Sequence, residues 1–218
     1  MRKENLELFL WLKEVLGVEE VFLGERYEVR DKLSLLEALK RQVFKCQKCP
    51  LHRTKTNYVF GDGNPDAGLL LVGEAPGRDE DLQGIPFVGR AGKLLTELLE
   101  EAGLDRKKDV YIANVLKCRP PGNRDPKPDE IAACSPYLDA QIRIIKPKVL
   151  GALGRYSGHF LSGQNLPLSS LRGRVMRSIY GIKLVVTYHP AAILRNPNLI
   201  DRSRKDFELM LKLLREED

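Results

Sequence analysis

A strand signal, a turn and an acidic cluster follow one another in Gly68-Leu-Leu-Leu-Val-Gly-Glu-Ala-Pro-Gly-Arg-Asp-Glu-Asp81. The apolar run at residues 69–72 lies between glycines, which is typical of a short strand buried on both faces, as the strands of parallel sheets are. In open α/β sheets, ligands bind in the crevice beyond the carboxyl ends of the strands. Glu74, directly after this strand, is therefore a candidate functional residue, although a plain scaffold explains these residues equally well.

The chain continues through Gly84-Ile-Pro-Phe-Val-Gly-Arg-Ala-Gly92 into a helix pattern with leucines at positions 94, 95, 98 and 99. The free N–H groups at the start of such a helix suit an anion such as phosphate. Neither half matches the glycine-rich fingerprints of nucleotide-binding proteins. The motif indicates a place for a ligand but does not identify the ligand.

Strand and helix patterns alternate along the rest of the chain. Further strands are predicted at residues 109–115, 149–153 and 182–187. Helices are predicted at residues 1–16, 128–145 and 199–215, and a further helical stretch follows the strand at 149–153 and ends at 161. Another helix is predicted to start at residue 31 or 34 and to run toward residue 46, with a capping box of Ser34 and Glu37. This alternation predicts a three-layer α/β/α sandwich around a short four-stranded parallel sheet. We expect residues 1–30 to form an N-terminal helical extension and residues 31–218 to form the main domain.

The composition indicates a globular protein with a basic surface. The 218 residues include 36 Lys and Arg against 30 Asp and Glu, a formal net charge of +6, which favours a polyanionic partner without requiring one. There is no charged-then-apolar N-terminal signal and no apolar run of membrane length, so we expect a soluble, cytoplasmic protein without a membrane partner. We also expect a monomer. Many charged residues with only 3 Met are typical of heat-adapted proteins.

The 4 cysteines form a candidate metal site. Cys46 and Cys49 make a C-x-x-C pair, and Cys118 and Cys134 follow much later. In an intracellular chain, thiols in this pattern are more typical of metal ligands than of disulfides, and ordinary buried cysteines are the simpler alternative. Four thiolates accept either zinc or a four-iron four-sulfur cluster, and the spacing does not choose between them.

The motifs and cysteines together resemble a known family, the iron-sulfur uracil-DNA glycosylases, which are family four of the uracil-DNA glycosylase superfamily. The resemblance rests on Gly73-Glu-Ala-Pro-Gly77, Phe87-Val-Gly-Arg-Ala-Gly92, Asn114-Val-Leu-Lys-Cys-Arg-Pro-Pro121 and Tyr188-His-Pro-Ala-Ala192, with the cysteines interleaved. It extends from about residue 33 to the C-terminus. It implies an enzyme that flips uracil out of single- or double-stranded DNA and hydrolyses its N-glycosidic bond, leaving an abasic site for base excision repair. It also implies that a 4Fe-4S cluster is bound by Cys46, Cys49, Cys118 and Cys134.

The resemblance implies roles for the residues of a base pocket. Phe87 would stack on the flipped base, and Asn114 would bond the N3–O4 edge of uracil, where cytosine presents the reversed pattern. His189 would donate to O2 and stabilise the leaving uracil anion, as an oxyanion hole does. The remaining assignments are Ala75 to substrate binding, and Glu74, Glu80 and Asn123 to catalysis.

Two positions depart from another branch of the superfamily. That branch has an aspartate at the position of Ala75, where it orients the attacking water, and a tyrosine at the position of Gly77. Because both side chains are missing here, we hypothesise a dissociative mechanism in which stabilisation of the leaving group contributes most. A related subgroup traps DNA covalently through a histidine-containing insertion between Asn114 and Cys134. This interval contains no histidine here, so we expect turnover.

Apolar and basic residues near the last motif are candidates for DNA contact. Ile193 and Leu194 follow the turn at His189, where the superfamily places a side chain that fills the gap left by the flipped base. The alternative is that both residues cap the core. Six arginines in predicted loops would bind phosphate, or would form a solvated face: Arg119, Arg124, Arg172, Arg174, Arg177 and Arg195. Arg90, where the helix after Gly89 begins, is a further candidate for DNA contact.

A second hypothesis is a catalytically weak nucleic-acid-binding protein whose cluster organises a DNA-contact loop. The complete set of pocket residues favours the enzyme. The cysteines lie far in sequence from most of the pocket residues, so we predict that the cluster has a structural role. It would anchor the loop of Cys46 against the helix that carries Cys134.

Overall fold

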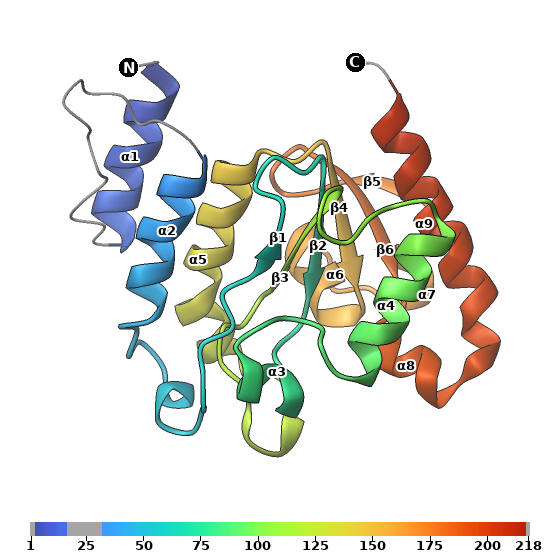
Figure 1. Ribbon diagram of the computed structural model, residues 1–218, viewed down its shortest axis with the longest axis horizontal. Coiled ribbons are helices and arrows are strands. Elements are labelled where there is room, and N and C mark those ends of the chain that lie inside the picture. The colour runs from blue at the N-terminus through green and yellow to red at the C-terminus, as the bar shows by residue number, and fades with distance from the viewer. Residues whose placement is uncertain (1–2, 17–31, 217–218) are drawn as a thin grey trace.

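The computed structural model describes residues 3–16 and 32–216 and places helices on both faces of one β-sheet (Figure 1). In this part of the chain the sheet has six strands in the order β1-β3-β2-β4-β6-β5. Their bounds are Asp62–Gly63 (β1), Leu69–Gly73 (β2), Val110–Asn114 (β3), Val149–Leu153 (β4), Val175–Arg177 (β5) and Lys183–Thr187 (β6).

The central strands β3, β2, β4 and β6 are parallel, as the buried apolar runs predicted. Strands β1 and β5 pair antiparallel with the two edges. The prediction of a four-stranded, purely parallel sheet is therefore wrong in its strand number. Both missed strands are only two or three residues long and have no fully buried residue, so neither produces the apolar run by which the others were found.

The longer helices lie close to where the apolar spacing placed them. They are α1 Lys3–Leu16, α2 Lys32–Val43, α4 Arg90–Glu101, α5 Pro128–Ile145, α6 Arg155–Ser162 and α9 Ile200–Arg215. The shorter α-helices are α3 Arg78–Gln83, α7 Leu168–Leu171 and α8 Pro190–Arg195. The short 3-10 helices are η1 Pro50–Arg53, η2 Pro121–Asn123 and η3 Pro197–Leu199. Ser34 lies inside α2, so the predicted capping box with Glu37 is not the start of that helix. None of the helices described is long and apolar enough to cross a membrane.

Alternate residues of β2 supply the two halves of the core. Leu70 and Val72 pack into a cluster with residues of α1, α2, α5 and α6. Leu69 and Leu71 pack into a second cluster on the other face, with residues of α4 and α9. The predicted α/β layering, with helices on both faces, is confirmed.

Helix α1 packs against α5 and belongs to the first core cluster. Leu12 is fully buried there, and the guanidinium of Arg143 lies 4.9 Å from the ring centre of Trp11. The described part of the predicted extension therefore joins the same core as the rest. Residues 1–2 and 17–30 of the extension lie outside the described residues, and the domain boundary stays a prediction.

Parallel strands place their carboxyl ends at one edge of a sheet. Helix α3 after β2, turn η2 after β3 and helix α8 after β6 gather at that end, at the bottom of Figure 1. The segments with the candidate functional residues therefore meet although they are far apart in the sequence.

Candidate functional site

A pocket of about 380 Å³ opens beyond the carboxyl ends of β2, β3 and β6. Its volume is within the range of small-molecule sites, roughly 300–1,000 Å³. Every residue that the sequence assigned to catalysis or to substrate binding contributes to its lining: Glu74, Ala75, Glu80, Phe87, Asn114, Asn123 and His189. The roles of these residues are not tested by their positions, but one cavity is shared by all of them.

Asn114 ends β3 and presents an unpaired acceptor to this pocket. The residue is 2% exposed, and its Oδ1 atom is buried without a hydrogen-bond partner among the described residues. A buried polar atom left unpaired costs about 1–3 kcal/mol. Its neighbour across the sheet, Gly73, leaves the space for it, because a Cβ at Gly73 would lie 2.3 Å from Asn114 Oδ1. The arrangement suits a ligand that brings a hydrogen-bond donor.

Phe87 lies in the loop before α4 with an unusual backbone. Its φ of 53° is in the left-handed region, and its side chain is buried. Such a conformation costs on the order of 1–3 kcal/mol and persists where packing enforces it. Here the packing comes from Gly92, where a Cβ would lie 1.9 Å from the carbonyl oxygen of Phe87. The glycine of the helix start therefore sets the position of the aromatic ring.

His189 caps the start of α8, and its own hydrogen bond selects the tautomer. Its Nδ1 accepts a hydrogen bond from the backbone N–H of Ala191 at 3.1 Å. The proton of a neutral imidazole then sits on Nε2. Burial, together with the cation of Arg195, lowers the pKa of His189 to about 4. At neutral pH the residue is an uncharged donor through Nε2–H.

Glu74 follows β2 directly and has a strongly shifted acidity. Burial first, and the nearby carboxylate of Asp125 second, raise its pKa to about 7, while Arg155 opposes the shift. Asp125 accepts a hydrogen bond from the hydroxyl of Tyr156 at 2.6 Å. Neither Asp125 nor Tyr156 was predicted from the sequence. Asp125 lies in a proline- and glycine-rich loop and Tyr156 in helix α6, and neither segment carries a pattern that would place it beside Glu74.

Glu80 is occupied by backbone groups. Its carboxylate accepts hydrogen bonds from the N–H groups of Gly77 at 3.1 Å, Val88 at 2.9 Å and Gly89 at 3.0 Å. It ties the start of α3 to the loop that carries Phe87. The assignment of Glu80 to catalysis stays a prediction, and these bonds make it a support of the pocket wall.

The arginines divide into paired and available side chains. Arg124 forms two short hydrogen bonds with the buried Glu130, Arg172 pairs with the buried Asp206, and Arg119 donates to Asn123 Oδ1 at 2.7 Å. Arg177 lies in strand β5 and Arg195 is the last residue of helix α8, so their prediction as loop residues is wrong. The exposed arginines of the predicted set include Arg90, Arg174 and Arg195, of which Arg195 lines the pocket.

The two apolar candidates on α8 lie in opposite environments. Ile193 is 3% exposed and packs in the core cluster with α4 and α9, so its prediction as a DNA contact is wrong and the core-capping alternative holds. Leu194 is 47% exposed. Successive helix residues point about 100° apart, which is why one faces the core and the other solvent.

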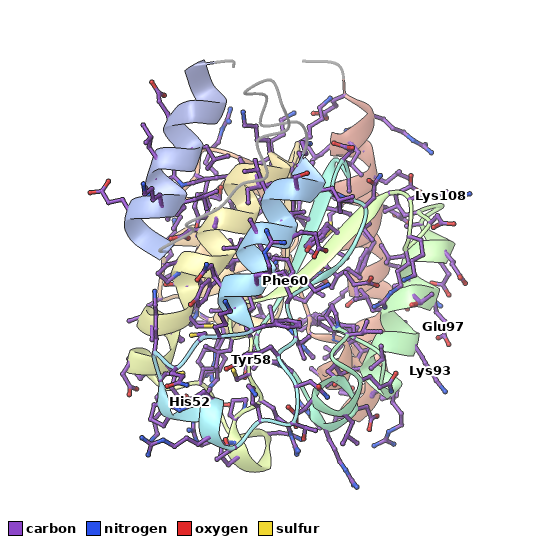
Figure 2. The ribbon with its side chains drawn as sticks, turned by 60° about the vertical axis from the view of Figure 1, so that its left-hand side comes forward. His52, Tyr58, Phe60, Lys93, Glu97 and Lys108 are labelled. Atoms are coloured by element: carbon purple, nitrogen blue, oxygen red, sulfur yellow. The ribbon has the colours of Figure 1, made fainter. Side chains whose placement is uncertain are left out.

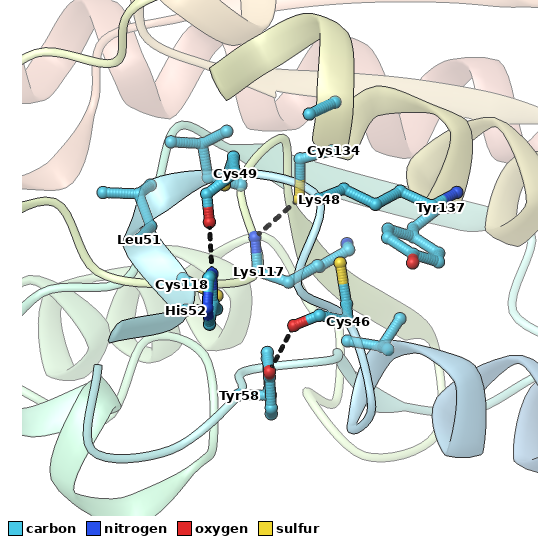
Figure 3. Close-up of a pocket in the computed structure, with 13 residues that line it drawn as sticks. Cys46, Lys48, Cys49, Leu51, His52, Tyr58, Lys117, Cys118, Cys134 and Tyr137 are labelled. Carbon is cyan, nitrogen blue, oxygen red and sulfur yellow. Dashed lines mark hydrogen bonds between the residues drawn. The ribbon is translucent and has the colours of Figure 1, made fainter. Parts of the chain in front are cut away.

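All four cysteines line a second pocket, although they come from separate elements (Figure 3). Cys46 follows α2, Cys49 precedes η1, Cys118 follows β3 and Cys134 lies in α5, and all are free thiols. Among the described residues, no three His, Cys, Asp or Glu side chains are spaced to hold a single metal ion. A set of four thiols around one pocket fits the ligands of an iron-sulfur cluster.

Burial controls the acidity of three of these thiols. It raises the pKa of Cys134 to about 11 and also raises the pKa values of Cys49 and Cys118, and negative charge on neighbouring cysteines would add to the effect. These three free thiols are therefore protonated at neutral pH, and a bound metal is what turns such groups into thiolates.

Polar groups missed by the sequence analysis surround the cysteine pocket. The Tyr58 hydroxyl donates to the carbonyl oxygen of Cys46, and His52 Nδ1 lies 2.6 Å from the carbonyl oxygen of Cys49. The N–H of Lys117 donates to Cys134 Sγ at 3.2 Å. These contacts are drawn in Figure 3. The sequence offered one signal for Lys117, its place between an expected strand and Cys118.

Comparison with known proteins agrees with the motifs. Residues 60–215 match the model of the uracil DNA glycosylase superfamily. The chain is 49% identical over 180 residues to the type-4 uracil-DNA glycosylase of Archaeoglobus fulgidus, covering 79% of this chain and 90% of the relative. It is 50% identical over 163 residues to the type-4 enzyme of Thermotoga maritima, covering 74% and 84%. It is 32% identical over 162 residues to the type-5 uracil-DNA glycosylase of Thermus thermophilus, covering 68% and 61%.

Proposed function

Because the chain belongs to the uracil DNA glycosylase superfamily, in its type-4 branch, we propose that the pocket binds one uracil flipped out of DNA. The protein is a uracil-DNA glycosylase, a hydrolase of N-glycosyl bonds that acts in base excision repair. The observation that carries the proposal for the pocket is the unpaired Oδ1 of Asn114.

Asn114 reads the edge of the base. Uracil N3–H donates to Asn114 Oδ1, and the amide nitrogen of Asn114 donates to uracil O4. Cytosine presents an acceptor and an amino group at these positions, so it would leave the buried Oδ1 unpaired. A site built around such hydrogen bonds rejects an analogue that cannot make them. Phe87 stacks on the ring, which is worth about 1–3 kcal/mol per base.

His189 stabilises the leaving group. As the N-glycosidic bond breaks, negative charge collects on the uracil, including its O2 atom. The Nε2–H of His189 donates to this oxygen and strengthens its bond as the charge grows. With a pKa of about 4, the imidazole is already neutral and its tautomer is set before the substrate arrives. One donor of this kind is typically worth about 100- to 1,000-fold in rate.

Glu74 acts on the sugar side of the bond. The breaking bond leaves positive charge on the sugar ring, as in other glycoside hydrolyses. The ionised carboxylate of Glu74 stabilises this charge and orients the water that attacks it. Glu80 is held by three backbone N–H groups, and Ala75 and Gly77 provide no carboxylate, which leaves Glu74 as the carboxylate at the end of β2 for this work. Loss of the base precedes attack by water in this dissociative mechanism.

The four cysteines hold a 4Fe-4S cluster in this proposal. When bound, the cluster supplies a metal-thiolate cross-link between the Cys46–Cys49 segment, the segment after β3 and helix α5. The chain's own residues perform every step on the substrate, since none of the four cysteines lines the base pocket. Around that pocket, Arg90 and Arg195 bind phosphate and Leu194 fills the space left by the flipped base.

The test is release of uracil from an oligonucleotide that carries one U opposite G, detected as an alkali-labile site. We expect wild-type protein to release the base, and His189→Ala to lower the rate by about 100- to 1,000-fold. Asn114→Ala should lower uracil release while leaving affinity for duplex DNA without uracil unchanged. A His189→Ala variant as fast as wild type would refute the proposed mechanism, and DNA binding without release would favour the binding-protein hypothesis.

A further inference from the structure

Lys117 is a fully buried lysine that the mechanism does not use. Its side chain is 1% exposed, and it lies in the segment that links Asn114 to Cys118. Burying an ammonium group is costly unless it is paired and hydrogen-bonded. In the described ranges 3–16 and 32–216, Lys117 forms no ion pair with a carboxylate. Its ammonium group therefore has to be stabilised by hydrogen bonds.

The hydrogen bonds of Lys117 point at the base-reading residue. Its Nζ donates to the carbonyl oxygen of Asn114 at 2.8 Å and to Oε1 of Gln141 at 2.6 Å. Gln141 is itself fixed on α5, because its Nε2 donates to the carbonyl oxygen of Phe60 at 2.9 Å. A chain of three hydrogen bonds therefore holds the end of β3 against α5 and the segment before β1.

Asn114 depends on such backbone support. Its Oδ1 has no partner, so that atom gains no support from a hydrogen bond of its own before the ligand binds. On one side, Asn114 is held by its pairing with Gly73 in β2. On the other side, the bond from Lys117 holds its carbonyl group. Small displacements at a recognition site weaken binding, since its groups must stay within about 0.5 Å of their productive geometry.

The same residue touches the cysteine pocket. While its Nζ bonds Asn114, the backbone N–H of Lys117 donates to Cys134 Sγ at 3.2 Å, and the next residue is Cys118 (Figure 3). Lys117 does not line the base pocket. It therefore does not contact the substrate directly, and its hydrogen bond to Asn114 links it to a residue that lines the base pocket.

We propose that Lys117 is a positioning residue for base recognition, which holds Asn114 in its reading orientation. This inference rests on the proposed role of Asn114. Its alternative is that Lys117 merely fills space in the core.

Lys117→Met tests the proposal, because methionine has a similar length and no hydrogen-bond donor. We expect inhibition by free uracil to weaken by about tenfold, the equivalent of one buried hydrogen bond. Affinity for a duplex with a tetrahydrofuran abasic analogue, which has no base to read, should stay within about twofold. Iron content and visible absorption should match wild type, since all four cysteines remain. The control is Lys108→Met. Lys108 is exposed and lies far from Tyr58 and His52 of the cysteine pocket in Figure 2, so its substitution should change none of these values.

A double-mutant cycle separates positioning from packing. If Lys117 acts through Asn114, Lys117→Met should add no further loss of uracil release in an Asn114→Ala background, whereas independent effects would add. Additive losses of uracil release in the double mutant would overturn the proposal. So would an equal loss of affinity for free uracil and for abasic DNA, a loss of iron, or unchanged inhibition by free uracil. Should Lys117→Met not fold, Gln141→Met removes one of the two partners of Nζ and should also weaken inhibition by free uracil. A wild-type protein that releases no uracil would instead refute the function itself.

Discussion

The Phe87 ring and the His189 imidazole lie 5.5 Å apart, centre to centre, with their planes inclined by 33°. One comes from the loop before α4 and the other from the start of α8. Glycines make this approach possible. A Cβ at Gly73 would lie 2.7 Å from the Phe87 ring, and one at Gly154 would lie 3.0 Å from His189 Cβ. The shape of the base pocket is therefore set by side chains that are absent as much as by those present.

Gly73→Ala should close the pocket without unfolding the protein. The new methyl group would overlap both Asn114 Oδ1 and the Phe87 ring, so we expect uracil release to fall by at least about 100-fold, the scale of losing one catalytic donor. Kinetics on the U·G oligonucleotide would measure this. Gly68→Ala at the other end of β2 is the matched control, because its Cβ would meet only the flexible tip of Leu214. Equal rates for Gly73→Ala and the control would contradict the pocket geometry.

Glu74 should make both rate and stability depend on pH. Its pKa is raised from 4.5 to about 7, so the folded state binds this proton more tightly than the unfolded state does. Between these pH values the protein loses stability as pH rises, because the carboxylate must ionise where it is buried. Glu74→Gln should therefore gain thermal stability relative to wild type between about pH 5 and about pH 8.

The rate of uracil release should rise with pH over the range in which ionisation of Glu74 lowers stability. If the ionised carboxylate is the working form, uracil release by wild type rises as pH passes through about 7, and Glu74→Gln is slower and loses this rise. Glu97→Gln changes an exposed glutamate that points to solvent from α4 in Figure 2 and should behave as wild type. A rate that falls as Glu74 ionises would count against the proposed role.

Leu194 and Ile193 form a matched pair for testing the DNA wedge. Leu194→Ala should slow uracil release from double-stranded DNA and leave single-stranded DNA unaffected, because only the duplex has a stack to hold open. Ile193→Ala should instead lower the free energy of unfolding by about 2–5 kcal/mol, the cost of emptying a core position. Rates on both DNA forms and a denaturant titration would measure these effects. Equal slowing on both DNA forms by Leu194→Ala would exclude a wedge.

Cys134→Ala tests the structural role of the cysteine site. We expect lower iron content, weaker visible absorption and a lower melting temperature. A covalent cross-link is typically worth about 2–5 kcal/mol, and each kcal/mol shifts the melting temperature of a chain this size by roughly 2–4 °C. Ser135→Ala on the same helix is the control. A Cys134→Ala protein with unchanged melting temperature and full activity would show that the cluster does not anchor the fold.

Local pattern was enough to find the four parallel strands and, at the end of the first, Glu74. Parallel strands bring their carboxyl ends to one edge of the sheet, so polar residues that follow them are brought to the same edge. The motif order then indicated the family, and this resemblance assigned Phe87, Asn114 and His189 to the base pocket. Strands β1 and β5 were missed because the pairing of so short a segment depends on its neighbour and not on its own residues.

Contacts between segments far apart in the sequence decided which side chains are buried, paired or shifted in acidity. Ile193 is buried by α4 and α9, Arg124 is neutralised by Glu130, and Lys117 is enclosed between β3 and α5, none of which its neighbours in sequence reveal. The same holds for acidity, since Glu74 and His189 owe their shifted pKa values to desolvation by the folded chain. Hydrophobic pattern is a property of adjacent residues, whereas burial, pairing and dielectric environment arise only when separate segments close around a side chain.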